Sequence, residues 1–182
     1  MNSEKRLEVE VKVRVASLPA LRKKLLAMGA KKESPRALER NLVFDSPAGD
    51  LRGKGILLRL RRVAKRSILT MKTPAAGNPA YKVRRETEVG VSDFSGMEAI
   101  LLGIGFRPVF IYEKFREVLA LDGIRIMLDE TPIGDFLEIE GRPGGIDAVA
   151  GRLGFCRGEY LTESYYRLFL LSGRSGHMVF TR

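Results

Sequence analysis

Hydrophobic and polar residues alternate along much of the chain, and this pattern predicts β-strands. The clearest case is Leu7 to Val15, which reads L-E-V-E-V-K-V-R-V, with charged residues on one face and valines on the other. A period of two in a β-branched segment is typical of a strand with one buried face. By the same criterion we predict further strands over residues 42–45, 56–63, 67–72, 81–89, 110–121, 124–129 and 136–140.

Helical spacing of apolar residues separates these strands. Ser17 is a predicted N-cap, because leucines follow it at helical spacing and Gly29 provides a C-terminal stop. Asp122-Gly123 is the turn of a predicted β-hairpin. We predict helices over residues 17–28, 92–102, 146–153 and 162–171.

The size of the chain agrees with one domain. Its 182 residues suit a single unit, since barrels often exceed the ~100–150 residues typical of a domain. We assign residues 1–171 to this domain and expect residues 172–182 to form a mobile tail. No apolar run approaches the roughly 20 residues of a membrane span, and no signal-peptide pattern is present, so we expect a cytoplasmic protein without a membrane partner. A single cysteine, Cys156, and a single histidine, His177, exclude Cys-rich and His-rich metal sites.

The chain is strongly basic, with 32 lysines and arginines against 22 acidic residues and a formal charge of +10. Such a protein attracts polyanions, so nucleic acid, an anionic membrane surface or a phosphorylated small molecule could be its partner. The positions of the charges have to distinguish these classes.

Charges of like sign gather on single faces of the predicted strands. Residues two apart on one face lie ~7 Å from each other, so pairs such as Glu8/Glu10 and Arg59/Arg61 repel unless a counter-ion or ligand is near. The acidic positions are Glu8, Glu10, Glu86, Glu88, Asp129, Glu138 and Glu140. The basic positions are Lys12, Arg14, Arg59, Arg61, Lys72, Lys82, Arg84, Lys114, Arg116 and Arg125.

Two arrangements of these faces stay open. In an ordinary antiparallel sheet, the charged face is turned to water. In a closed antiparallel barrel, it could instead point inward, where carboxylates suit Mg²⁺ or Mn²⁺ and basic side chains suit phosphate oxygens. Such a barrel would bind a metal-chelated polyphosphate. A nucleic-acid partner fits less well, because the acidic residues would repel a phosphate backbone and aromatic residues make up only 8% of the chain.

An ordered series of motifs resembles the CYTH superfamily, the triphosphate tunnel enzymes. The predicted first strand carries Glu8-x-Glu10-x-Lys12, the signature of that group. Similar segments follow in order: Leu58-Arg59-Leu60-Arg61, Leu69-Thr70-Met71-Lys72, Arg84-x-Glu86-x-Glu88, Lys114-x-Arg116, Asp129, and Gly134 to Glu140. Thr162-Glu163-Ser164-Tyr165 resembles a phrase of the class IV adenylate cyclase-like branch, although Glu163 replaces a frequent lysine. Asn41 likewise stands where many members carry an acid.

The resemblance implies an α+β fold built on a closed eight-stranded antiparallel barrel, the triphosphate tunnel, with helices outside. It implies Mg²⁺ or Mn²⁺ as the cofactor, with Glu8, Glu10, Asp129, Glu138 and Glu140 as metal ligands or their close support. The triphosphate would be bound by Lys12, Arg59, Arg61, Lys72, Arg84, Lys114 and Arg116. The candidate catalytic residues are Lys12, Glu86 and Glu88, the glutamates by supporting a second metal or orienting water. Tunnel lining and interstrand pairing are both open for Arg14, Lys82, Arg84 and Arg125.

These implications favour a phosphohydrolase acting on tripolyphosphate, a nucleoside triphosphate or thiamine triphosphate. A class IV adenylate cyclase, which converts ATP to cyclic AMP and pyrophosphate, is the alternative. A non-catalytic polyphosphate-binding module is a third reading. The C-terminal motif favours the cyclase-like branch, but no nucleoside pocket is identifiable in the sequence. Monomer and homodimer are both open.

Overall fold

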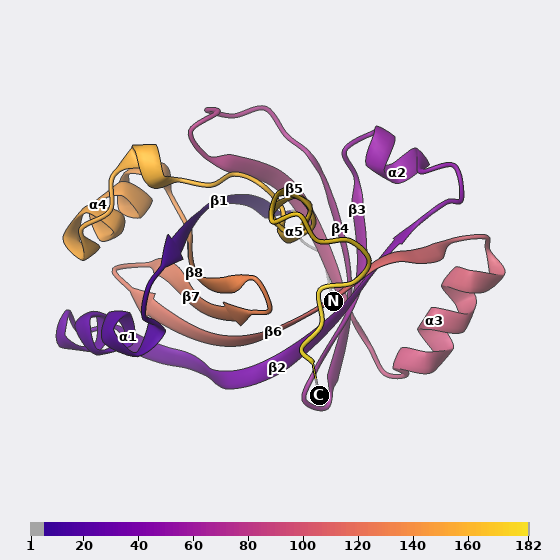
Figure 1. The fold of residues 1–182 in the computed structure, drawn as a ribbon, viewed down its shortest axis with the longest axis horizontal. Helices are drawn as coiled ribbons and strands as arrows, with labels where there is room; N and C mark the ends of the chain where they lie inside the picture. Colours follow the sequence, from indigo (N-terminus) through magenta and orange to yellow (C-terminus); the bar gives the residue numbers. More distant parts are fainter. Residues whose placement is uncertain (1–5, 182) are drawn as a thin grey trace.

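The predicted strands close into a barrel (Figure 1). The computed structural model describes residues 6–181, and within them every neighbouring pair of strands is antiparallel. The order around the barrel is β1-β5-β4-β3-β2-β6-β7-β8. The strands are β1 (Arg6–Val15), β2 (Lys31–Asp45), β3 (Leu57–Val63), β4 (Arg66–Pro74), β5 (Lys82–Val91), β6 (Arg107–Leu121), β7 (Ile124–Thr131) and β8 (Gly134–Glu140). The closed eight-stranded antiparallel barrel of an α+β fold is confirmed.

Helices cover much of the apolar outer face of the barrel. They are α1 (Leu18–Ala27), α2 (Asp50–Gly53), α3 (Phe94–Gly103), α4 (Pro143–Leu153) and α5 (Tyr165–Leu171), with a 3₁₀ turn, η1, at Arg157–Glu159. Leu25 of α1 and Ile146 of α4 share a buried cluster with Ile139 of β8. Because side chains alternate along a strand, packing the apolar faces outside turns the charged faces into the barrel. None of the helices within residues 6–181 is both long and apolar enough to cross a membrane.

The largest difference from the sequence-based prediction concerns β2. Alternation predicts a strand only over residues 42–45, whereas β2 runs over Lys31–Asp45 and pairs with β6. Residues 31–40 are mostly polar and include Pro35, which disfavours a strand on local grounds. The ladder shifts register on both sides of Ser34, and such irregularities accommodate a proline. Pairing with a long neighbouring strand therefore overrides the local sequence preference.

Two helices have their N-caps one or two residues later than the sequence predicts. Asp93 rather than Ser92 caps α3, because its carboxylate accepts a hydrogen bond from the amide of the second residue of that helix. Ser164 rather than Thr162 caps α5, because its hydroxyl accepts from a backbone amide of the first helical turn. The short helix α2 has no counterpart in the prediction.

Met178 and Phe180 pack against the barrel within the segment that the sequence predicts as a mobile tail, whereas most of residues 171–181 are exposed. Met178 is fully buried, and its backbone amide donates to the carbonyl of Ile111 at 3.0 Å. Its carbonyl accepts from the amide of Glu113 at 2.8 Å, so the segment runs beside β6. The ring of Phe180 packs on Phe115 with centroids 5.3 Å apart. The glycines and serines before Met178 are typical of a mobile segment. The partner strand, β6, is distant in sequence, so local patterns do not predict this contact.

Candidate active site in the barrel interior

The interior of the barrel holds a charged cavity of about 670 Å³. Its lining includes every candidate site residue from the sequence analysis except Asp129: Glu8, Glu10, Lys12, Arg59, Arg61, Lys72, Arg84, Glu86, Glu88, Lys114, Arg116, Glu138 and Glu140. These residues lie on six strands of the closed barrel, β1, β3, β4, β5, β6 and β8, and each strand contributes its inward face. The choice between a solvent-facing sheet and an inward-facing barrel is settled in favour of the barrel.

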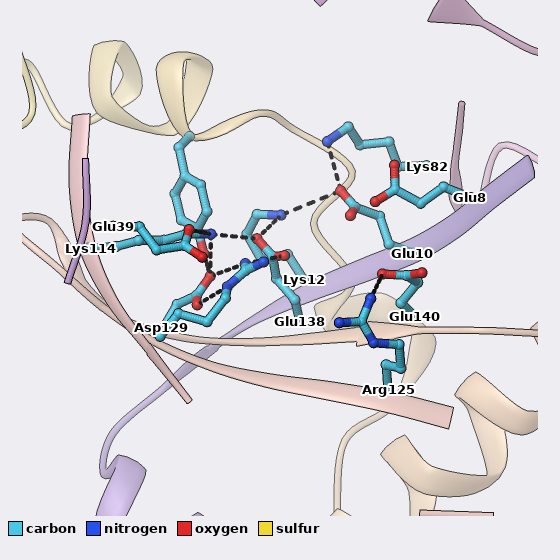
Figure 2. Close-up of polar contacts among 12 residues, drawn as sticks. Glu8, Glu10, Lys12, Glu39, Lys82, Lys114, Arg125, Asp129, Glu138 and Glu140 are labelled. Atoms are coloured by element: carbon cyan, nitrogen blue, oxygen red, sulfur yellow. Dashed lines mark hydrogen bonds and ion pairs between the residues drawn. The ribbon is translucent and has the colours of Figure 1, made fainter. Parts of the chain in front are cut away.

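One side of the cavity is an acidic wall, formed by glutamates of β1, β5 and β8. Its members are Glu8, Glu10, Glu86, Glu138 and Glu140. Lys72 Nζ donates to Glu8 Oε1 at 2.7 Å and lies 2.6 Å from Glu86 Oε2. Lys82 Nζ donates to Glu10 Oε1 at 2.7 Å, and Figure 2 shows this contact beside Glu8. Lysines therefore satisfy much of the acidic wall at short range.

Lys12 lies at the centre of this arrangement, with 1% of its surface exposed. Its Nζ is 3.0 Å from Glu138 Oε1 and 3.8 Å from Glu10 Oε1 (Figure 2). Burial disfavours the ammonium form, but the two carboxylates outweigh burial and raise the pKa of Lys12 above its ordinary value. Lys12 is therefore a buried, permanent cation at neutral pH.

The glutamates of the acidic wall differ in how readily they ionise. Burial, followed by the carboxylates of Glu10 and Glu86, raises the pKa of Glu8 to about 7 against the pull of Lys72. Burial also raises the pKa of Glu140. Burial acts in the same direction on Glu10, but there Lys82 and Lys12 outweigh it and lower the pKa. Part of the acidic wall is thus held closer to its protonated form, mainly because it is buried.

The opposite side of the cavity is a cationic wall on β3 and β6, formed by Arg59, Arg61 and Lys114. Lys114 is paired with Asp129 at 2.9 Å, but the carboxylate contacts of the two arginines are long: Arg59 lies 3.6 Å from Glu88, and Arg61 lies 3.5 Å from Glu39 and 3.4 Å from Glu88. Several buried polar atoms here have no hydrogen-bond partner within the described residues, namely Arg59 Nε, Arg61 Nε, Glu39 Oε2 and both amide atoms of Asn41. The positive charge of the cationic wall is therefore only partly compensated, whereas the glutamates of the acidic wall are paired with lysines at short range.

Asp129 lies behind the wall of the cavity rather than on its surface. Its side chain is fully buried and lies outside the cavity lining. It accepts hydrogen bonds from Lys114 Nζ at 2.9 Å, from Arg116 Nε at 2.6 Å and from the Tyr165 hydroxyl at 2.6 Å. With its oxygens occupied by these donors, Asp129 is placed to anchor two cations. Inward alternation correctly predicts its face but cannot reveal the side chains that cover it.

The structure decides the basic positions that the sequence leaves undecided. Lys82 and Arg84 line the cavity, and so does Arg125, which lies 3.7 Å from Glu140. Arg14 instead donates to the carbonyl of Ile133 and does not line the cavity.

Three further polar residues belong to the site but are not among the residues predicted from the sequence. Glu39 is buried and contacts both Arg61 and Lys114, but it lies on the unpredicted part of β2. Thr70 donates to Glu88 at 2.7 Å. The hydroxyl of Tyr112 accepts from Arg59 at 3.3 Å. Side chains alternate along β4 and β6, and this alternation alone predicts that Thr70 and Tyr112 point into the barrel.

The acidic wall fits a divalent cation in its chemistry. Within residues 6–181, no three His, Cys, Asp or Glu side chains form a ready-made metal cage. Mg²⁺ is commonly held by one or two carboxylates together with water and substrate phosphates, so a complete protein cage is not required. Glu10 and Glu140 are directly paired across β1 and β8, and Glu8 follows on the same inward face. Burial raises the pKa of Glu8 and of Glu140, and a cation bound beside them would favour the ionised form of both carboxyl groups.

The CYTH domain family matches residues 6–151, which include all the strands of the barrel. This chain belongs to that family. Members of the CYTH family are adenylate cyclase-like or triphosphatase enzymes and generally depend on a divalent metal.

Individual CYTH relatives are distant in sequence but close in fold. A Methanocaldococcus jannaschii protein named “Putative adenylate cyclase MJ0240” is 28% identical over 135 residues, which are 74% of this chain and 76% of that protein. A Vibrio parahaemolyticus structure described as a “putative adenylate cyclase” superposes with a TM-score of 0.82 at 18% identity, covering 92% of this chain and 99% of its own. The structure of the Hippeastrum protein HpAC1, which is described as a “putative adenylyl cyclase” with a dominant triphosphatase activity, superposes with a TM-score of 0.67 at 21% identity. The superposition covers 92% of this chain and 97% of that chain.

Proposed function

We propose that this protein is a divalent-metal-dependent hydrolase of a triphosphate bound inside the barrel, with inorganic tripolyphosphate as the simplest substrate. The observation that carries this proposal is the under-compensated cationic wall facing an acidic wall across one enclosed cavity. The proposal has three parts: phosphate binding, metal binding and attack by water.

Phosphate oxygens would supply the partners that the cationic wall lacks. A buried polar atom without a partner costs about 1–3 kcal/mol, and charged groups cost more. Among residues 6–181, the buried Nε atoms of Arg59 and Arg61 have no hydrogen-bond partner, so both guanidinium groups retain donors for a ligand. Arginine and lysine match the oxygens of a polyphosphate as bidentate and point-charge partners. A triphosphate is therefore a better occupant than a neutral molecule of the same size.

Glu8, Glu10 and Glu140 are the residues that we expect to hold the metal. Glu138 is less available, because Lys12 lies 3.0 Å from one of its oxygens and Arg116 donates to the other. A bound Mg²⁺ or Mn²⁺ would neutralise charge on phosphate oxygens. The cations of this chain do the same from the other side of the substrate.

Hydrolysis follows from positioning and charge compensation. The oxygen of a water molecule forms a bond to the terminal phosphorus, the bond from that phosphorus to the bridging oxygen breaks, and pyrophosphate leaves. The two protons of the water end on the products or the solvent. Lys12, Arg59 and Lys114 compensate the charge that spreads over the non-bridging oxygens. Lys72 lowers the pKa of Glu86 against the effect of burial, so Glu86 is an ionised acceptor that can orient the water.

Adenylate cyclase activity is the second candidate, favoured by the names of the relatives. A cyclase must also hold a nucleoside so that its 3′-hydroxyl reaches the α-phosphorus. The aromatic residues at one end of the cavity are engaged with each other: Phe110 packs on Tyr112 at 5.6 Å and on Tyr166 at 4.9 Å between ring centroids. These contacts leave less room for a stacked base, which is why we rank hydrolysis first.

A product-resolved assay separates the candidates. Wild-type protein is incubated with tripolyphosphate, ATP or thiamine triphosphate and Mg²⁺ or Mn²⁺, and phosphate, pyrophosphate and cyclic AMP are measured separately. We expect phosphate release from tripolyphosphate. Cyclic AMP and pyrophosphate from ATP, with tripolyphosphate intact, would support the cyclase instead. A rise in melting temperature with tripolyphosphate but no turnover of any substrate would support a binding module.

A further inference from the structure

The segment after residue 151 lies outside the CYTH match, yet it reaches the centre of the site. Leu161 and Lys12 exchange two backbone hydrogen bonds, of 3.1 and 2.7 Å, which attach this segment to β1. The Ser164 cap then starts α5, and Figure 1 shows α5 over the interior of the barrel. The first residue of α5, Tyr165, is 7% exposed and lines the cavity.

Tyr165 contacts both buried lysines of the site. The Nζ of Lys12 lies 4.9 Å from the centroid of the Tyr165 ring, and the Nζ of Lys114 lies 4.7 Å from it. The hydroxyl donates to Asp129 at 2.6 Å, and Asp129 in turn accepts from Lys114. The ring is held edge-on against Phe136 with centroids 5.5 Å apart. One side chain thus touches two cations and the carboxylate that anchors one of them.

We propose that Tyr165 is a positioning residue that fixes the ammonium groups of Lys12 and Lys114 for the substrate. The inference rests on the proposed function, because it assigns these lysines to phosphate oxygens. Tyr165 acts through the lysines and takes no part in bond making. The tyrosine of α5 thereby makes a segment beyond the matched CYTH residues part of the site.

The physical reason lies in the flexibility of lysine. A lysine side chain has a flexible four-carbon stem, and fixing it costs rotamer entropy. An aromatic face attracts an ammonium ion, and the attraction is stronger when both are desolvated. Two ammonium groups held by one ring would be in place before the charge on phosphate develops. Such preorganisation acts on turnover more than on ground-state binding.

The test compares Tyr165→Phe with wild-type protein. The substitution keeps the ring and removes only the hydroxyl, so Asp129 loses one donor and can draw Lys114 closer. With tripolyphosphate and Mn²⁺, we expect kcat to fall about tenfold, while KM changes less than about threefold. Tyr165→Leu also removes the aromatic face, and its kcat should fall about a hundredfold.

Phe169→Leu is the matched control for the docking of α5. Phe169 lies one turn further along the same helix, is buried, and packs on Phe110 rather than on a lysine. We expect this variant to lower the melting temperature at least as much as Tyr165→Phe while kcat stays within about twofold of wild type. If Phe169→Leu lost as much kcat as Tyr165→Phe, the docking of α5 alone would explain the effect and the positioning role would be refuted.

A second readout is independent of hydrolysis. In protein with isotope-labelled lysine, nuclear magnetic resonance reports the mobility of the Lys12 and Lys114 side chains, assigned through Lys12→Arg and Lys114→Arg. We expect Tyr165→Leu, which removes the aromatic face, to increase the mobility of both, and Phe169→Leu to leave it unchanged. If wild-type protein did not hydrolyse tripolyphosphate but the lysines became mobile in Tyr165→Leu, the proposed function would fail and the positioning role would stand. Unchanged mobility and unchanged kcat in Tyr165→Leu would overturn the positioning role.

Discussion

The acidic and cationic walls of the cavity are built in the same way but differ in how closely their charges are paired. Both consist of charged side chains that alternate with apolar residues along strands of the barrel. On the acidic wall, Glu8 and Glu10 each accept a hydrogen bond from a lysine at 2.7 Å. On the cationic wall, Arg61 has carboxylate contacts no closer than 3.4 Å and a buried Nε without a partner.

This difference indicates where a polyanion binds. Buried charges are stable only when they are paired and hydrogen-bonded. The acidic wall already has most of its partners, so its remaining demand is for extra positive charge around Glu8 and Glu140. The cationic wall still has unused donors, so its demand is for oxygen acceptors. A metal–triphosphate complex offers a cation to one wall and oxygens to the other.

The largest effect is expected on the acidic wall, from Glu10→Gln. The substitution removes a carboxylate that we assign to the metal and keeps the volume of the side chain. We expect the rate of phosphate release to fall about a hundredfold or more, and a higher Mn²⁺ concentration to be needed for half-maximal activity. Circular dichroism checks that the protein stays folded. Turnover and metal dependence equal to those of wild type would show that Glu10 holds no metal.

On the cationic wall, adjacent residues provide a matched pair. Arg61 points into the cavity, whereas Arg62 is exposed on the outside, where its guanidinium carbon lies 4.1 Å from the centroid of the Phe94 ring. Arg61→Gln should lower kcat/KM for tripolyphosphate by about tenfold to a hundredfold, or ~1–3 kcal/mol of transition-state stabilisation. Arg62→Gln should leave kcat/KM within about twofold. Equal losses in the two variants would point to a general effect of net charge.

Much of this arrangement is readable from the sequence, and the exceptions have a common cause. Glu8, Glu10 and Lys12 share a face because strand residues alternate, so their inward position follows once the barrel closes. Asn41 and Glu39 are harder to place, because Pro35 and the polar residues around it conceal β2. The covered position of Asp129 depends on Tyr165, which arrives from a distant helix. Period and composition report local structure, whereas contacts between distant elements decide which inward groups stay open to the cavity.

The acidic wall should also leave a signature in the pH dependence of stability. Because the folded protein raises the pKa of Glu8 from 4.5 to about 7, it holds this proton more tightly than the unfolded chain does. The contribution of Glu8 to stability is therefore fully present below pH 4.5 and is lost as the pH rises through about 7. In chelator-containing buffer, the melting temperature of wild type minus that of Glu8→Gln should fall across this range. A difference that is flat or rises with pH would contradict the raised pKa.

The smallest effect is expected from supplying the cationic wall with an acid. Asn41 is fully buried and is paired with Arg61 across β2 and β3, and neither of its amide atoms has a hydrogen-bond partner in the part of the chain that the structure describes. Asn41→Asp should compensate part of the positive charge, so we expect a melting temperature a few degrees higher and a KM for tripolyphosphate about three- to tenfold higher. Calorimetry and steady-state kinetics measure the two changes. A lower KM would mean that the wall is not short of negative charge.

The most direct test of the account is phosphorus nuclear magnetic resonance of tripolyphosphate with a stoichiometric amount of wild-type protein and Mg²⁺. The account predicts that the tripolyphosphate signals disappear while orthophosphate and pyrophosphate appear in equal amounts, and that added chelator stops the reaction. Tripolyphosphate that stays intact under conditions where the same protein converts ATP to cyclic AMP and pyrophosphate would contradict it.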